Sequence, residues 1–234
     1  MSIFEQSEPV PSFDEWGIRA FTTTRAVGSF GMLSQEPVGD VMRRWGELRA
    51  ELKAGGPRLA TAGQVHGNTV VEHEPAWSGW LRVESADGHL SLGRGTGMAV
   101  TVADCVPVFL AHPSGAAAIL HSGWRGTVAR ITEAGVARFT AAGLEASDLR
   151  VHLGPSICGR CYEVSRDVFA QLTGRDPGAP ACVDLRSVIA DHARSAGVRQ
   201  ITTSPSCTRC DNDRFFSHRA GDPGRQIGVI IAHA

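Results

Sequence analysis

Two apolar runs of strand length constrain the fold most, and they follow one another in the chain. They read MAVTVADCVPVFLAH at Met98–His112 and AAAILHS at Ala116–Ser122. Apolar runs bounded by turn residues are typical of strands that lie in a hydrophobic core. Shorter runs of the same kind, ITTSPSCT and GVIIA, occur near the C-terminus. The chain therefore has more than one apolar strand that must be covered by other elements.

Helical periodicity supplies those covering elements. The segments Val128–Gly143, Glu163–Gly174 and Asp184–Gly197 each place apolar residues at helical spacing and end on a glycine. With 234 residues, 42% of them hydrophobic, one domain can bury a sizeable core. We predict an α+β fold in which one domain, residues 1–234, forms an α/β/β/α layered arrangement with mixed sheets.

Charge and composition exclude several functions. The net charge of −1 and the pI near 6.7 give no field that would attract nucleic acid or an anionic membrane. The N-terminal segment is acidic, and no apolar stretch approaches the length of a membrane span. We therefore expect a cytoplasmic protein with neither a nucleic acid nor a membrane as partner. Nothing in the sequence indicates an oligomeric state. The six cysteines are too few for a secreted disulfide framework, which favours reduced thiols or metal ligands.

Three side chains that can bind metal stand at predicted strand ends. Cys105 lies in the first apolar run, where Pro107 predicts a bulge or a sheet edge just after it. His66 lies in QVHGN, and His121 ends the second run. Two histidines and a cysteine are a sufficient ligand set for catalytic zinc, which keeps a fourth position open. The simpler interpretation makes Cys105 a small core residue.

The other cysteines form two Cys-x-x-Cys pairs. They are CGRC at Cys158–Cys161 and CTRC at Cys207–Cys210. The stretch between the pairs is far longer than the roughly 15 to 20 residues of common zinc ribbons. This separation favours packed thiols or a redox pair over a structural metal, which stays as the alternative. Asp104 alternates to the face opposite Cys105, which leaves it at most a hydrogen bond to a ligand.

Five segments together resemble the laccase-domain, or polyphenol oxidase, family. They are QVHGNTV, VTVADCVPVFL, AAAILHSGWRGT, LGPSICGRCYEV and CTRCDNDRFFSHRAGDPGRQIGVI, and they occur in order from His66 to Ile230. Members of that family are described as purine nucleoside phosphorylases with adenosine deaminase activity, and some as peptidoglycan editing factors. The resemblance implies that His66, Cys105 and His121 bind an active-site zinc.

The chain also departs from the family pattern. The segment AVGSFGMLSQEPVGD lacks an asparagine that the family usually carries, ADGHL replaces ADALV, and Ser122 follows the second zinc histidine. These changes affect the expected pocket walls and spare the ligands. Arg25 and Arg125 are candidates for binding phosphate or ribose, although Arg25 also suits a solvated loop and Arg125 a structural ion pair. We interpret Trp124 as a core residue.

Three functions follow from these residues and from what the resemblance implies. The first is a zinc-dependent purine nucleoside phosphorylase acting on inosine, adenosine and methylthioadenosine, with adenosine deaminase activity in which the metal activates water. The chain lacks the His-x-Glu and Pro-Cys-x-x-Cys motifs of the usual nucleobase deaminases. The second is a cysteine-dependent amide hydrolase or peptidoglycan-precursor editing enzyme with Cys105 as nucleophile. The third is a copper polyphenol oxidase, which the absence of any His-x-His pair disfavours.

Overall fold

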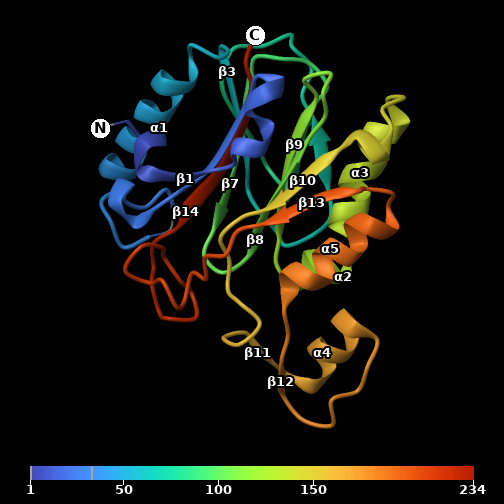
Figure 1. The fold of residues 1–234 in the computed structure, drawn as a ribbon. Helices are drawn as coiled ribbons and strands as arrows, with labels where there is room; N and C mark the ends of the chain where they lie inside the picture. The colour runs from blue at the N-terminus through green and yellow to red at the C-terminus, as the bar shows by residue number, and fades with distance from the viewer. Residues whose placement is uncertain (1, 33) are drawn as a thin grey trace.

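Two six-stranded mixed sheets pack face to face and are covered by helices on their outer sides (Figure 1). This computed structural model describes residues 2–32 and 34–234. The arrangement confirms the predicted single-domain α+β fold with α/β/β/α layers. Among the described residues, no helix combines the length and the apolar character needed to cross a bilayer.

The first sheet contains the first and the last strand of the described chain. Its order is β1-β2-β14-β7-β3-β5, in which β3 pairs in parallel with both β7 and β5 and the other neighbours are antiparallel. Its strands are β1 (Ser7–Pro9), β2 (Ile18–Thr23), β3 (Arg58–Ala62), β5 (Gly79–Val83), β7 (Thr96–Val102) and β14 (Gln226–Ala232).

The second sheet takes its strands from the middle of the chain. Its order is β13-β10-β8-β9-β6-β4, with parallel pairs only at its two edges. Its strands are β4 (Val70–Glu72), β6 (Gly88–Ser91), β8 (Val106–Ala111), β9 (Ala117–Ser122), β10 (Arg150–Leu153) and β13 (Gln200–Thr203). A separate two-stranded ribbon joins β11 (Glu163–Val164) to β12 (Ala181–Cys182).

Helices cover both outer faces, and the three segments with helical periodicity all contain one. The helices are α1 (Val38–Leu52), α2 (Trp124–Val128), α3 (Ile131–Ala141), α4 (Arg166–Thr173) and α5 (Leu185–Ser195). Ser165 and Asp184 cap the N-termini of α4 and α5 with their side chains. Gly174 ends α4 in the left-handed conformation that glycine adopts without strain.

Three hydrophobic cores correspond to the three interfaces between layers. The core between the sheets contains Phe109, Ile119 and Ile230. The core under α3 and α5 contains Phe139 and Ile189. A third core lies between the first sheet and α1 and contains Trp45, Leu48 and Leu52. The fold therefore depends on burial spread over all four layers, so no single ligand is needed to hold it together.

The prediction of one strand through Cys105 was wrong. The run Met98–His112 contains two strands in different sheets, β7 and β8, and the chain crosses between the sheets at residues 103–105. Asp104 makes this crossing with φ of 81°, a left-handed conformation that a short polar side chain tolerates. Pro107 is not at a sheet edge, because β8 lies between β10 and β9. It is the second residue of β8, opposite the end of β10, where the ladder no longer needs its missing N–H.

A buried pair of histidines at the edge of the second sheet formed by β4 and β6 makes the fold sensitive to acid. The Nε2 atom of His73 lies 2.9 Å from Nδ1 of His89, which is completely buried in β6. Burial lowers the pKa of both rings, that of His89 to about 3. The unfolded chain takes up a proton at His89 near pH 6.5 and the folded chain does not, so the stability contributed by this ring is lost as pH falls below about 6.5.

We expect the free energy of unfolding to fall by about 1.3 kcal/mol between pH 7.5 and 5.5 on account of His89 alone. Denaturant unfolding of the wild type and of a His89→Asn variant at both pH values measures this share, because other titrating groups are common to both proteins. The variant should lose less stability on acidification. Equal losses would show that His89 does not remain neutral in the folded protein.

Candidate metal centre and cavity

The structure brings His66, Cys105 and His121 together where the two sheets meet. His66 lies in the loop between β3 and β4, Cys105 lies at the crossing from β7 to β8, and His121 is the penultimate residue of β9. One ligand atom from each side chain lies within 4.8 Å of the other two. The two imidazole rings are 4.8 Å apart between centroids and meet edge to face. Three segments distant in sequence thus form one compact donor set.

Gly123 explains how the cluster can be so tight. A Cβ atom at this position would stand 2.8 Å from the Sγ of Cys105 and 3.3 Å from a ring carbon of His66. Any larger residue would push these side chains apart. Gly123, two residues after His121, therefore allows the donor set to pack closely. The two imidazoles and the thiol fit a zinc site with an open position.

Asp87 holds two members of this cluster in position through hydrogen bonds. The sequence alone did not identify it as a functional residue. Its buried carboxylate accepts a hydrogen bond of 2.8 Å from Nδ1 of His121. It also accepts bonds from the backbone N–H groups of Val65, His66 and Gly67. Burial raises the pKa of Asp87, but these bonds and the charge of His121 hold that pKa below its ordinary value. One carboxylate thus orients one ring and fixes the loop that carries the other.

The three donors also shift one another's protonation. Burial raises the pKa of the Cys105 thiol, but the charge and hydrogen bond of His121, with those of His66, outweigh it and lower that pKa to about 6. Burial lowers the pKa of His121, whereas the Cys105 thiolate and Asp87 raise it to about 9. Cys105 is therefore a thiolate at neutral pH, which is the form that binds metal or acts as a nucleophile.

A cavity of about 580 Å³ opens beside the donor set. Its walls come from the loop after β2, from β3 and β7, and from the segment before β14. Gln64 on the wall pairs with Thr101 through three hydrogen bonds, which continues the contact of β3 with β7 beyond the end of the strand. Cationic side chains of Arg82 and Arg225 also line it. The volume lies in the range of small-molecule binding sites.

The departure from the family pattern at the N-terminal loop falls on this wall. Phe30, Gly31, Met32 and Ser34 line the cavity, while Leu33, in the same segment, lies outside the described residues. The changed segment ADGHL contains Asp87, and an aspartate directly before an apolar strand was the available sign of a buried polar contact.

The two arginines predicted to bind substrate lie elsewhere. Of the residues described as lining the cavity, neither Arg25 nor Arg125 is one. Arg25 forms an ion pair of 2.6 Å with Asp222, and its guanidinium packs on the ring of Phe216. Arg125 is exposed and stacks on Trp124, which packs against the core as predicted. Arg25 thus holds the loop before β14, and Arg125 points outward from α2.

The second group of potential metal ligands consists of the two Cys-x-x-Cys pairs. All six cysteines are free thiols, and one sulfur from each of Cys158, Cys161, Cys207 and Cys210 lies within 4.8 Å of the other three. The separation in sequence was therefore a misleading guide, because a parallel bridge between Ser156 and Cys207 brings the two segments together.

Asp104 contacts the second of these segments and not a ligand of the first cluster. Its carboxylate accepts hydrogen bonds of 2.6 Å from the Thr208 hydroxyl and from the backbone N–H of Arg219. The sequence allowed Asp104 at most an indirect bond to a metal ligand, and its bonds instead fasten the crossing at residues 103–105 to Thr208 and Arg219.

Known proteins resemble this chain over nearly its whole length. A family described as multi-copper polyphenol oxidoreductase laccase matches residues 25–233. A purine nucleoside phosphorylase of Streptomyces coelicolor is 32% identical over 226 residues, which cover 93% of this chain and 92% of that protein. An adenosine deaminase from an unknown prokaryotic organism is 34% identical over 151 residues, 58% of each chain. The crystal structure of YlmD from Geobacillus stearothermophilus has a TM-score of 0.87 at 26% identity and covers 96% of this chain and 94% of that one. The chain belongs to the laccase-domain family.

Proposed function

We propose that the protein is a zinc-dependent purine nucleoside phosphorylase that also deaminates adenosine. The observation that carries the proposal is the donor set of His66, Cys105 and His121 beside a cavity of about 580 Å³. Relatives that carry the names purine nucleoside phosphorylase and adenosine deaminase support the choice of substrate. Inosine, adenosine and methylthioadenosine are the proposed nucleosides, and residues 1–234 form the catalytic domain.

The residues around the cavity have distinct roles in this proposal. His66, Cys105 and His121 hold zinc, which when bound supplies a Lewis acid that polarises an oxygen of water or substrate. Asp87 keeps His121 in the tautomer that presents Nε2 to the metal, since Nδ1 donates to the carboxylate. The thiol of Cys105 is ionised at neutral pH, because its pKa is lowered to about 6. The Cys105 thiolate is thus ready for the metal, whereas His121, whose pKa is raised to about 9, must release the proton from Nε2 before it can bind the ion.

Phosphate requires cationic partners, and the cavity offers them. Arg82 and Arg225 line it together with His218. Arg225 is held in place because its guanidinium donates to the carbonyl oxygens of Asp222, Pro223 and Gly224. A guanidinium fixed in this way binds phosphate oxygens with little loss of side-chain freedom. That Arg25 and Arg125 also bind substrate stays a prediction, in addition to the proposed roles of Arg82 and Arg225.

Product analysis tests the proposed function directly. Adenosine or inosine incubated with the zinc-loaded protein and phosphate is expected to give free base and ribose 1-phosphate, and adenosine is expected to give some inosine. Omitting phosphate should stop release of the base and leave deamination intact. His233→Ala is the matched control for His66→Ala, because His233 follows the end of β14 that pairs with the start of β7, away from Cys105.

A second candidate function uses the same residues in other roles. The Cys105 thiolate, whose pKa the two histidines lower to about 6, also suits a nucleophile that cleaves an amide. The substrate would then be an amide such as a peptidoglycan precursor. Turnover of an amide or a cell-wall peptide without turnover of any nucleoside would support this function and contradict the phosphorylase.

A further inference from the structure

We propose that Cys158, Cys161, Cys207 and Cys210 bind a second zinc ion, which has a structural role. The four sulfur atoms lie within 4.8 Å of one another, and those of Cys161 and Cys210 are 3.5 Å apart. Four thiolates at 2.3 Å from one zinc ion stand about 3.8 Å from each other in a tetrahedron. A disulfide would need about 2.05 Å between two sulfurs. The spacing therefore fits a single ion enclosed by four sulfurs.

The backbone at both Cys-x-x-Cys turns points N–H groups at sulfur. The amide of Cys210 donates to the Sγ of Cys207 at 3.4 Å, and the amide of Cys158 donates to the same atom at 3.2 Å. Amide donors of this kind stabilise thiolates, which are the form that coordinates a metal.

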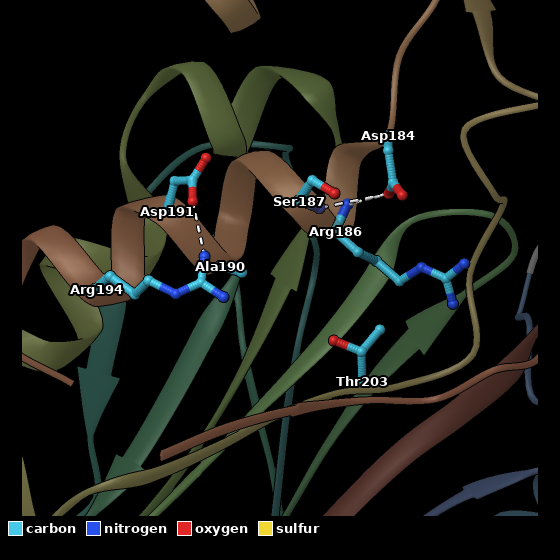
Figure 2. A pocket seen from close by; sticks show the side chains of 7 residues that line it. All are labelled: Asp184, Arg186, Ser187, Ala190, Asp191, Arg194 and Thr203. Atoms are coloured by element: carbon cyan, nitrogen blue, oxygen red, sulfur yellow. Dashed lines mark hydrogen bonds and ion pairs between the residues drawn. The ribbon is translucent and has the colours of Figure 1, made fainter. Parts of the chain in front are cut away.

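The segments that carry the cysteines are held in place by the helix α5. Figure 2 shows Arg186 reaching from this helix toward the chain beyond Thr203, away from Asp191 and Arg194, which pair with each other. The Arg186 guanidinium donates to the carbonyl oxygens of Ser204 and Ser206, directly before Cys207. The cavity of about 310 Å³ drawn in Figure 2 is lined by Arg186, Asp184, Asp191 and Arg194, whose charged groups already bond to other groups of the fold.

The other Cys-x-x-Cys turn packs on the same helix. A Cβ atom at Gly159, inside the turn, would stand 2.8 Å from the Cβ of Asp184, the residue that caps α5. The cap and Arg186 thus hold both turns against one end of one helix. A fixed frame of this kind brings four ligands to one point before metal binds, whereas a pair of surface thiols would need no such frame.

A second ion here would brace the wall of the proposed active site. Asp104, the neighbour of Cys105, is bonded to the hydroxyl of Thr208, the residue after Cys207. The carbonyl oxygen of Asp104 accepts from the N–H of Ile157, the residue before Cys158. The two cysteine turns therefore attach to one turn of chain, and fastening them together fixes the position of Cys105.

The zinc content of variants tests this proposal independently of catalysis. Protein purified with reductant and zinc should hold two zinc ions per chain, one of them in the His66 cluster. Cys161→Ser and Cys210→Ser should each hold one, His66→Ala one, and the double variant His66→Ala with Cys161→Ser close to none. Cys182→Ser is the matched control, because Cys182 is an exposed cysteine of the neighbouring strand β12 outside both clusters. It should hold two.

Alkylation of the unchanged protein tests the site without any substitution. In the zinc-loaded protein Cys182 should react with iodoacetamide at once, and the four cluster cysteines should react only after a strong chelator is added. The proposal is overturned if Cys161→Ser holds as much zinc as the wild type, if the four cysteines react as fast as Cys182, or if they form disulfides or bind iron in the presence of zinc. Loss of only the His66-dependent ion would count against the proposed catalytic centre and leave this site standing.

Discussion

Replacing His66 with alanine, or Cys105 with alanine, is expected to remove one zinc ion per chain and all nucleoside turnover together. Each substitution leaves two of three protein ligands, which cannot hold the ion tightly. The fold should survive, because the three cores contain many apolar residues in all four layers, and Cys105 only packs against one of them. Elemental analysis measures the loss of zinc, and far-UV circular dichroism checks that the fold survives. The control His233→Ala should match the wild type in zinc content and in circular dichroism. Copper in place of zinc in the wild type would contradict the assignment and favour the oxidase.

Cys105→Asp separates a ligand from a nucleophile. A carboxylate can still bind zinc but cannot form a thioester, so this variant should regain part of the metal that Cys105→Ala loses. Should Cys105→Ala keep full zinc and lose all activity, Cys105 is a nucleophile beside the metal, and the role given to zinc above is wrong.

Asp87→Asn is expected to weaken zinc binding by about 10- to 100-fold and to destabilise the fold by about 3 kcal/mol or more. The carboxylate of Asp87 accepts from three backbone N–H groups and from the His121 ring. The side-chain amide of the variant would place an NH₂ group, itself a donor, against some of these donors. Competition with a chelator measures the zinc affinity, and denaturant unfolding measures the stability.

Glu84→Gln provides the matched control for that variant. Glu84 is an exposed carboxylate three residues away on the same connection between β5 and β6, so its loss should change neither quantity. Unchanged zinc affinity in Asp87→Asn would show that the ligands are oriented without Asp87.

The sequence carried enough information for the layers and for the members of the candidate metal cluster. Helical spacing located α3, α4 and α5, and the apolar run ending in His121 is β9. The identities of His66, Cys105 and His121 followed from donor chemistry at strand ends. That they meet could not be derived from local pattern, because proximity arises from pairing between distant strands.

Errors arose where a tertiary contact overrides the local pattern. The apolar run through Cys105 looks continuous, and only the left-handed backbone at Asp104 divides it between two sheets. Asp87 escaped notice because three of its partners are backbone amides, which leave no trace in residue type, and the fourth, His121, is distant in sequence. The separation between the cysteine pairs was misread for the same reason: linear spacing says little about segments joined by a bridge such as that between Ser156 and Cys207.

The position of β14 has a consequence for the order in which the protein matures. This strand is made after every other strand described, yet it lies between β2 and β7 in the middle of the first sheet. During synthesis β2 and β7 therefore lack the strand that pairs with both of them until β14 has been made. The cavity wall at Arg225, next to the first residue of β14, is also absent until then. A ribosome-bound chain should therefore have no catalytic activity until β14 emerges, and its incomplete first sheet is expected to bind chaperones.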